Sequence, residues 1–271
     1  MSIDSTPFHL DPDSSAFYRR LDEHRFAPTL HAQGAWRDDE QHMAPVSGIL
    51  THAIDLHEPR ADMQLSRISF DILGMIPARP FTIDVRTTRP GRTIELVEAT
   101  MVIDDRAVVR GHAWRLATSD TSEVAAVELD AMPAPELFPE WEASKLWNGG
   151  YIAALLGRAD PQRRPGRTRT WLRSGSELLE DEPCSPTADL IRVVDTANGI
   201  GVRVSPTEWA FPNIDLTIHL LRDPVPGWVG FDTRVSFGPG GVGLTSTTLH
   251  DEQGPVGRAE QILTVRRLPL G

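Results

Sequence analysis

The chain is poor in the residues and patterns that several common classes of protein require. Its 271 residues include a single cysteine, Cys184, so neither an internal disulfide nor a cysteine-based zinc site can form. Basic residues number 27 against 38 acidic ones, and the net charge of -11 argues against a nucleic-acid binder, because phosphate recognition normally needs a positive surface. No apolar run approaches the roughly 18 residues of a membrane span. These features favour a cytoplasmic protein.

Common catalytic motifs are missing as well. The segment Pro45-Val46-Ser47-Gly48 is not a Gly-x-Ser-x-Gly elbow, so a serine nucleophile lacks support. The nine histidines form no His-Glu-x-x-His or other tight ligand spacing, and we therefore predict no metal and no cofactor.

What the chain does contain is a repeat with an offset of 148 residues. At this offset the alternating run 68–72 falls on 216–220, and Leu96, Thr100 and Val108 fall on Leu244, Thr248 and Val256. The alternation is kept while the chemistry changes at three positions. There the first copy has Ser47, Leu65 and Ala113, and the second has Asp195, Asn213 and Gln261. The first copy is therefore interpreted as scaffold and the second as the carrier of a site.

Each copy is expected to hold one helix and a series of strands. In the first copy, period-two patterning predicts strands, and a 3.6-residue spacing of apolar residues predicts a helix. The predicted elements are a strand at 26–36, a helix at 45–54 and strands at 64–73, 81–89, 93–103 and 107–117. In the second copy they are extended segments at 146–157 and 168–179, a helix at 186–199 and strands at 213–221, 228–236, 242–250 and 255–266.

Four segments follow from this layout. Residues 1–16 are predicted to be a loose arm, 17–118 the first copy, 119–145 an acidic and proline-rich linker, and 146–271 the second copy. A helix followed by a long antiparallel sheet favours a sheet that curls around the helix, and duplication within one chain supplies a partner for the exposed surface. The cleft between the copies is the expected ligand site.

The three polar replacements are the candidate catalytic residues. Asp195 lies at the edge of an apolar helix face, where burial raises the pKa of a carboxyl and a neighbouring amide lowers it. Gln261 shares a strand face with the small residues Gly257 and Ala259, which leave room beside it. Each has a structural alternative: a helix-end aspartate satisfied by local amides, a turn residue for Asn213, and an exposed edge position for Gln261.

Taken together, these residues resemble the active site of the double-hotdog acyl-CoA thioesterases of the thioesterase II type. The matching positions are Asp195 in VVDTANG, Asn213 in FPNIDLTIHL and Gln261 in VGRAEQI. The resemblance implies an α+β double-hotdog fold of two tandem helix-wrapped antiparallel sheets, an acyl-CoA substrate and a homodimer. Asn213 departs from the family, which has Thr or Ser at that position. An amide can hold a water, but unlike a hydroxyl it cannot relay a proton.

A second departure lies at the start of the first helix. His42, Met43 and Ala44 occupy the place where relatives often show a His-Gly-Gly run, and they are the candidate substrate-binding residues. If backbone amides there polarise the thioester carbonyl, Pro45 removes one donor and Met43 or Ala44 must serve. A surface or capping role for His42 is the alternative.

The leading hypothesis is an acyl-CoA thioesterase, a hydrolase in which Asp195 and Gln261, with Asn213, activate water. A second hypothesis is a non-catalytic acyl-CoA or lipid-binding hotdog protein. A third is an enoyl-CoA hydratase, which on this fold needs a His a few residues after the Asp, whereas Asp195 is followed by Thr196-Ala197-Asn198-Gly199.

Overall fold

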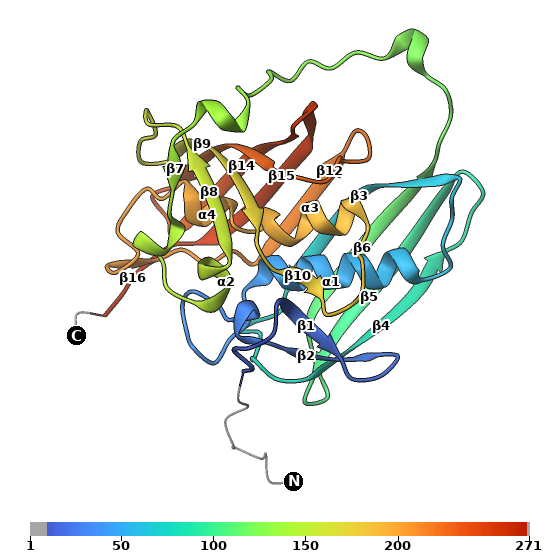
Figure 1. Ribbon diagram of the computed structural model, residues 1–271, viewed down its shortest axis with the longest axis horizontal. Helices are drawn as coiled ribbons and strands as arrows, with labels where there is room; N and C mark the ends of the chain where they lie inside the picture. The colour runs from blue at the N-terminus through green and yellow to red at the C-terminus, as the bar shows by residue number, and fades with distance from the viewer. Residues whose placement is uncertain (1–9, 270–271) are drawn as a thin grey trace.

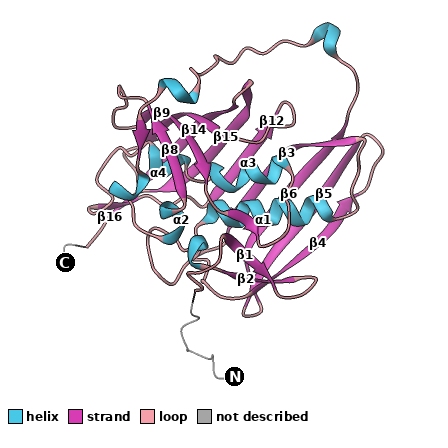
Figure 2. Ribbon diagram, viewed as in Figure 1, coloured by secondary structure: helices cyan, strands magenta, loops and turns pink. Residues whose placement is uncertain are grey.

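The structure is a computed structural model that describes residues 10–269. The predicted arm at 1–16 lies largely outside the described residues, and β1 already begins at Ala16. One long curved sheet wraps around two central helices that lie side by side, α1 (Met43–Leu56) and α3 (Pro186–Val194) (Figure 1). Strands make up one layer and helices the other (Figure 2).

The sheet takes its strands from both copies. In the described part of the chain its order is β10-β1-β2-β4-β5-β6-β3-β12-β15-β14-β13-β9-β8-β7. The strands of the first copy are β1 (Ala16–Arg20), β2 (Arg25–Pro28), β3 (Met63–Ile72), β4 (Phe81–Arg89), β5 (Ile94–Ile103) and β6 (Arg106–Ala117). Those of the second are β8 (Leu155–Ala159), β9 (Arg167–Ser174), β10 (Glu177–Leu179), β12 (Asp215–Leu220), β13 (Val229–Phe237), β14 (Val242–Asp251) and β15 (Gly254–Thr264). The short strand β7 (Glu140–Trp141), which pairs with β8, comes from the segment predicted to be the linker.

Smaller elements complete the chain. A separate two-stranded ribbon pairs β11 (Trp209–Ala210) with β16 (Arg266–Arg267). The short helices are α2 (Gly150–Ala153), α4 (Ala197–Ile200) and the 3-10 turns η1 (Leu30–Ala32), η2 (Ser122–Val124), η3 (Pro135–Leu137) and η4 (Ala143–Lys145). The connector from β6 to β7 arches over one end of the molecule (Figure 1). No helix in the described range is long and apolar enough to cross a membrane.

The predicted offset of 148 residues is confirmed in the sheet. Val97 pairs with Ala113 between β5 and β6, and Thr245 pairs with Gln261 between β14 and β15. The same offset relates Ser69↔His112 to Thr217↔Glu260, and Val85↔Ala99 to Thr233↔Thr247. It also relates the pairs Leu65↔Arg115 and Asn213↔Leu263. A one-residue slip would turn buried side chains to the outer face, so burial pins the register in both copies.

The offset fails in the helices, so the predicted match of Ser47 with Asp195 is wrong. The helix N-caps, His42 and Ser185, are 143 residues apart. Ser47 Oγ donates instead to the carbonyl of Ile191 at 3.0 Å. The physical reason is the connection that follows each helix. Six residues lie between the end of α1 at Leu56 and the start of β3, whereas a longer segment separates α3 from β12. Loop length is free to differ where register is not pinned.

Three other predictions differ from the structure. The predicted strand at 26–36 ends at Pro28 and is followed by η1, whose N-cap Thr29 accepts a hydrogen bond from His31 N–H. The segment predicted as extended at 146–157 contains α2 and only then β8. The helix predicted at 186–199 is divided into α3 and α4, with Asp195 and Thr196 between them.

The two long helices pack closely because Gly48 has no side chain. A Cβ at Gly48 would overlap the Cβ of Arg192 on α3 and approach Leu178. α3 itself starts at a strong N-terminal signal, in which Ser185 accepts from Ala188 N–H and Pro186 occupies the first turn. The contact between the helices fixes how the two copies meet, and therefore where the end of α3 lies.

We predict that Gly48→Ala destabilises the protein. Alanine is favoured over glycine inside a helix by about 1 kcal/mol, whereas overpacking typically costs about 1–3 kcal/mol. A net loss in the free energy of unfolding, measured by urea titration, is expected. Gly240→Ala is the control, since a Cβ at Gly240 meets nothing within 4 Å. Equal stability of the two variants would contradict close helix packing at this point.

Candidate active site

The three polar residues of the second copy come together although they lie on three different elements. Asp195 is the C-cap of α3 and is 3% exposed. Asn213 lies just before β12, in an isolated bridge with Leu263. Gln261 lies on β15 and is 1% exposed. Asp195, at the end of α3, therefore lies against the side chains of Asn213 and Gln261.

Two amide groups hold one oxygen of the aspartate. Asn213 Nδ2 donates to Asp195 Oδ1 at 2.6 Å, and Gln261 Nε2 donates to the same atom at 3.0 Å. Gln261 Nε2 also contacts the Asp195 carbonyl at 3.2 Å, and Asn213 Nδ2 contacts the Asp215 carbonyl at 2.9 Å. No donor to Asp195 Oδ2 is found among residues 10–269. One carboxylate oxygen is thus fixed, and the other is free to accept a proton.

The environment of Asp195 raises its pKa to about 7. Burial is the main cause, because it disfavours the charged carboxylate, and the negative charge of Asp215 adds to the effect. The hydrogen bonds from Asn213 and Gln261 oppose this rise by stabilising the ionised form. A carboxyl that titrates near neutral pH is well matched to taking up and releasing a proton.

His42 faces the free oxygen as a neutral imidazole. Its Nδ1 accepts a hydrogen bond from Ala44 N–H at 3.0 Å, so the ring proton is on Nε2. Burial lowers the pKa of His42 to about 3. The distance of 3.9 Å between His42 Nδ1 and Asp195 Oδ2 is therefore a polar approach and not an ion pair. The ring packs on Tyr151 with a centroid distance of 4.2 Å, which fixes its plane.

The three predicted substrate-binding residues, His42, Met43 and Ala44, do not all line the cleft. His42 and Met43 line the cleft beside Asp195, whereas Ala44 is fully buried and does not. The N–H of Ala44 is used by His42, and residue 45 is a proline without a donor. Met43 N–H has no acceptor within the described part of the chain. It is the first amide of α1, at the positive end of the helix dipole.

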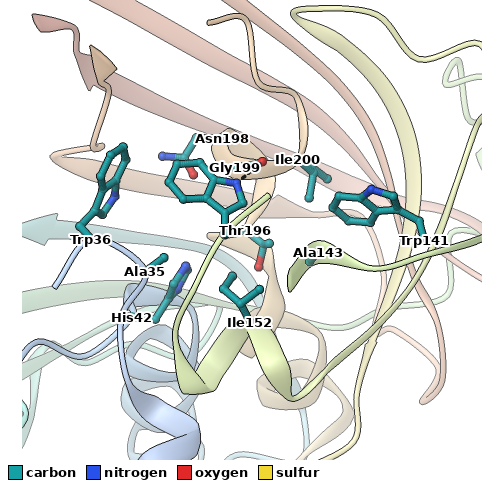
Figure 3. A pocket seen from close by; sticks show the side chains of 11 residues that line it. Ala35, Trp36, His42, Trp141, Ala143, Ile152, Thr196, Asn198, Gly199 and Ile200 are labelled. Carbon is teal, nitrogen blue, oxygen red and sulfur yellow. Dashed lines mark hydrogen bonds between the residues drawn. The ribbon is translucent and has the colours of Figure 1, made fainter. Parts of the chain in front are cut away.

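A cleft of about 570 Å³ opens onto this group and is lined by both copies. Ile72, Met75 and Ile76 form an apolar wall from the first copy, and Pro212 and Ile214 come from the second. A much smaller cavity of about 30 Å³ lies next to it, also in contact with His42 (Figure 3). Trp36 and Trp141 stand on opposite sides of that cavity (Figure 3).

Two residues at the site were missed by the sequence prediction. Asn198 lines both cavities, and its Nδ2 donates to Asn213 Oδ1 at 3.4 Å. Tyr151 is fully buried and its hydroxyl contacts Thr196 Oγ1 at 2.7 Å. A signal for Tyr151 was present in the pair Gly149-Gly150 before it. A side chain at Gly150 would overlap the carbonyl of Leu30, which marks a close approach of the two copies.

Two family profiles together match most of the chain. The profile of the acyl-CoA thioesterase C-terminal domain matches residues 125–265, and that of the N-terminal domain matches residues 32–116. The chain belongs to the acyl-CoA thioesterase family. Members of this family are thioester hydrolases, and the predicted recognition is confirmed. A comparison with curated protein sequences finds no match.

Solved structures similar to this thioesterase share its fold. A hot dog fold protein from Alicyclobacillus acidocaldarius has a TM-score of 0.73 at 16% identity, covering 95% of this chain and 98% of that one. The acyl-CoA thioesterase II TesB2 from Mycobacterium marinum has a TM-score of 0.67 at 15% identity, covering 93% and 96%. The tesB protein of Mycobacterium avium subs paratuberculosis has a TM-score of 0.64 at 17% identity, also covering 93% and 96%. These likenesses confirm the predicted double hotdog.

The raised pKa of Asp195 predicts a specific dependence of stability on pH. An unfolded Asp titrates near pH 4, whereas the folded one does so at about 7, so folding favours the protonated form. This contribution is fully present below about pH 4 and is lost as the pH rises through about 7. Relative to Asp195→Asn, the wild type should lose on the order of 4 kcal/mol across that range.

Chemical denaturation at a series of pH values measures this difference. Other titrating groups are shared by both proteins and cancel in the comparison. Asp84→Asn, which alters an exposed aspartate on β4, should follow the wild type. Parallel curves for the wild type and Asp195→Asn would show that the Asp195 carboxyl titrates in its ordinary range.

Proposed function

We propose that the protein hydrolyses an acyl-CoA to the free acid and CoA, using a water molecule activated by Asp195. The observation that carries this proposal is the different hydrogen bonding of the two carboxylate oxygens of Asp195. Oδ1 is fixed by Asn213 and Gln261, while Oδ2 has no donor from the described residues, and Asp195 lines the cleft. A base with one fixed oxygen and one free oxygen can hold a water in a single orientation.

The reaction then has two steps. The water oxygen attacks the thioester carbonyl carbon while Asp195 Oδ2 takes up one of its protons, and the carbonyl electrons move onto the oxygen. The tetrahedral intermediate collapses, the carbon–sulfur bond breaks, and the thiolate of CoA leaves. A thiolate departs without strong acid help, and the proton held on Asp195 neutralises it or returns to solvent. No covalent acyl-enzyme is formed.

The developing negative charge on the carbonyl oxygen requires a donor on the opposite side. Met43 N–H, at the start of α1, is available for this role, and the Nε2–H of His42 is a second donor. The low pKa of His42 keeps its ring neutral, so it acts as a hydrogen-bond donor and not as a cation. Ala44 has a supporting role, because its amide fixes the ring of His42.

Asn213 takes a positioning role in this proposal. Both contacts of its Nδ2 are made within the protein, to Asp195 and to the Asp215 carbonyl. It therefore replaces the Thr or Ser of the family as an anchor for the carboxylate, without relaying a proton. The apolar wall of the cleft suits an acyl chain, and the open side of the cleft suits the larger CoA portion.

We also propose that the chain assembles into a homodimer, on the basis of the family resemblance. A cytoplasmic location is proposed on the basis of the single cysteine.

Hydrolysis can be tested by the release of free thiol from short, medium and long acyl-CoAs. Asp195→Asn should lower kcat by about 10²–10⁴-fold, the usual contribution of a general base. Because the ionised carboxylate is the active form, wild-type kcat/KM should rise with pH and level off above about 7.

Asp84→Asn serves as the control and should keep full activity. Thiol release by Asp195→Asn within a few-fold of the wild type would contradict the role of Asp195. Tight acyl-CoA binding without thiol release would favour a binding protein, and loss of an enoyl-CoA double bond would favour a hydratase.

A further inference from the structure

Two buried polar atoms behind the candidate base lack hydrogen-bond partners. Gln261 Oε1 and Thr245 Oγ1 are both buried, and neither has a partner among the described residues. The two residues are directly opposite each other, Thr245 on β14 and Gln261 on β15, with side chains on the same inner face. Side chains in such a pair have Cβ atoms roughly 4.5–5.5 Å apart. The hydroxyl donor of Thr245 and the amide acceptor of Gln261 therefore lie on neighbouring residues.

Other inner-face hydroxyls of the second copy are already paired. Thr233 Oγ1 contacts Thr247 Oγ1 at 3.0 Å, and Thr168 Oγ1 contacts Thr170 Oγ1 at 2.9 Å. Thr245 stands apart from these pairs and is 0% exposed, so bulk solvent does not reach it. A buried hydroxyl or amide oxygen without a partner is costly, which makes a contact between these two groups favourable.

The internal repeat shows that the fold does not need a hydroxyl at this point. The residue equivalent to Thr245 is Val97, and the residue equivalent to Gln261 is Ala113, and these two also pair directly. Val97 is fully buried on the inner face of the first copy. The polar pair is therefore a property of the copy that carries Asp195, and an isosteric Val fits the same position.

We propose that Thr245 is a positioning residue that fixes the amide orientation of Gln261, by donating to one buried water that in turn donates to Gln261 Oε1. With Oε1 held by Thr245, the amide nitrogen must face Asp195, where it makes both of its contacts. If Oε1 were released, the amide could turn and present an oxygen to the carboxylate. That arrangement is repulsive and removes one of the two donors to Oδ1.

Loss of the Thr245 contact should therefore favour the protonated form of Asp195. Among the described residues, the charged or titratable side chains that face Asp195 are Asp215 at the start of β12, neutral His42 at the N-cap of α1, and Tyr151 on α2, whose pKa is raised by burial. Arg192, on the same helix, is engaged by Asp189 and by the Ser176 carbonyl. None of these replaces a donor lost from Gln261, so the change should appear in the titration of Asp195.

The test compares Thr245→Val with Thr245→Ser and with Thr247→Val, which removes a different buried hydroxyl from the same strand. In Thr245→Val, the pH midpoint of kcat/KM should move upward by roughly 0.5–1 unit. Thr245→Ser should restore the wild-type midpoint, and Thr247→Val should not move it. The same shift should appear in the carboxyl ¹³C resonance of Asp195, identified by its absence in Asp195→Asn.

A double-mutant cycle separates positioning from a general structural effect. In a Gln261→Ala background, Thr245→Val should cause no further shift, because the group through which it acts is gone. An unchanged midpoint in Thr245→Val, or the same shift with and without Gln261, would overturn the inference. The kinetic part of the inference rests on the proposed hydrolysis. The ¹³C titration does not need turnover, so a protein without thiol release would overturn the proposed function while this contact is still tested.

Discussion

The site depends on how one buried carboxylate is held. Two amide nitrogens, from Asn213 and Gln261, meet at Asp195 Oδ1, and they come from the entry of β12 and from β15. Burial pushes the pKa of this carboxyl upward and the two donors restrain it, which leaves it near neutrality. All three side chains come from the second copy, where the end of α3 lies against the entry of β12 and against β15. Without the two amide donors, Asp195 would be an ordinary residue at the end of a helix.

The strand pairing of the sheet could be predicted from the sequence because burial constrains its register. An offset of 148 residues aligns the strand pairs of both copies, including Val97↔Ala113 with Thr245↔Gln261. A shift by one residue would expose a whole buried face, so alternation carries the register. The helices and loops carry no such constraint. The connection after α3 is longer than that after α1, and the same offset therefore mispairs Ser47 with Asp195.

The candidate site residues could be predicted where the two copies of the repeat differ in residue type. Polar residues at positions that are apolar or small in the first copy pointed to Asn213 and Gln261, and the structure places both against Asp195. Asn198 and Tyr151 escaped prediction because they reach the site through local turns around α4 and α2, which alternation does not describe. The fold needs only an apolar or small residue at the equivalent positions, so the extra polarity is best explained by chemistry.

The role of Asp195 as a base for water, and not as a nucleophile, is the central claim. A single turnover of acyl-CoA by excess enzyme in H₂¹⁸O tests it most directly. Attack by water predicts one ¹⁸O atom in the released acid and none in the peptide that contains Asp195, as measured by mass spectrometry. Incorporation of ¹⁸O into that peptide would show that an acyl group had been attached to the carboxylate and would contradict the account.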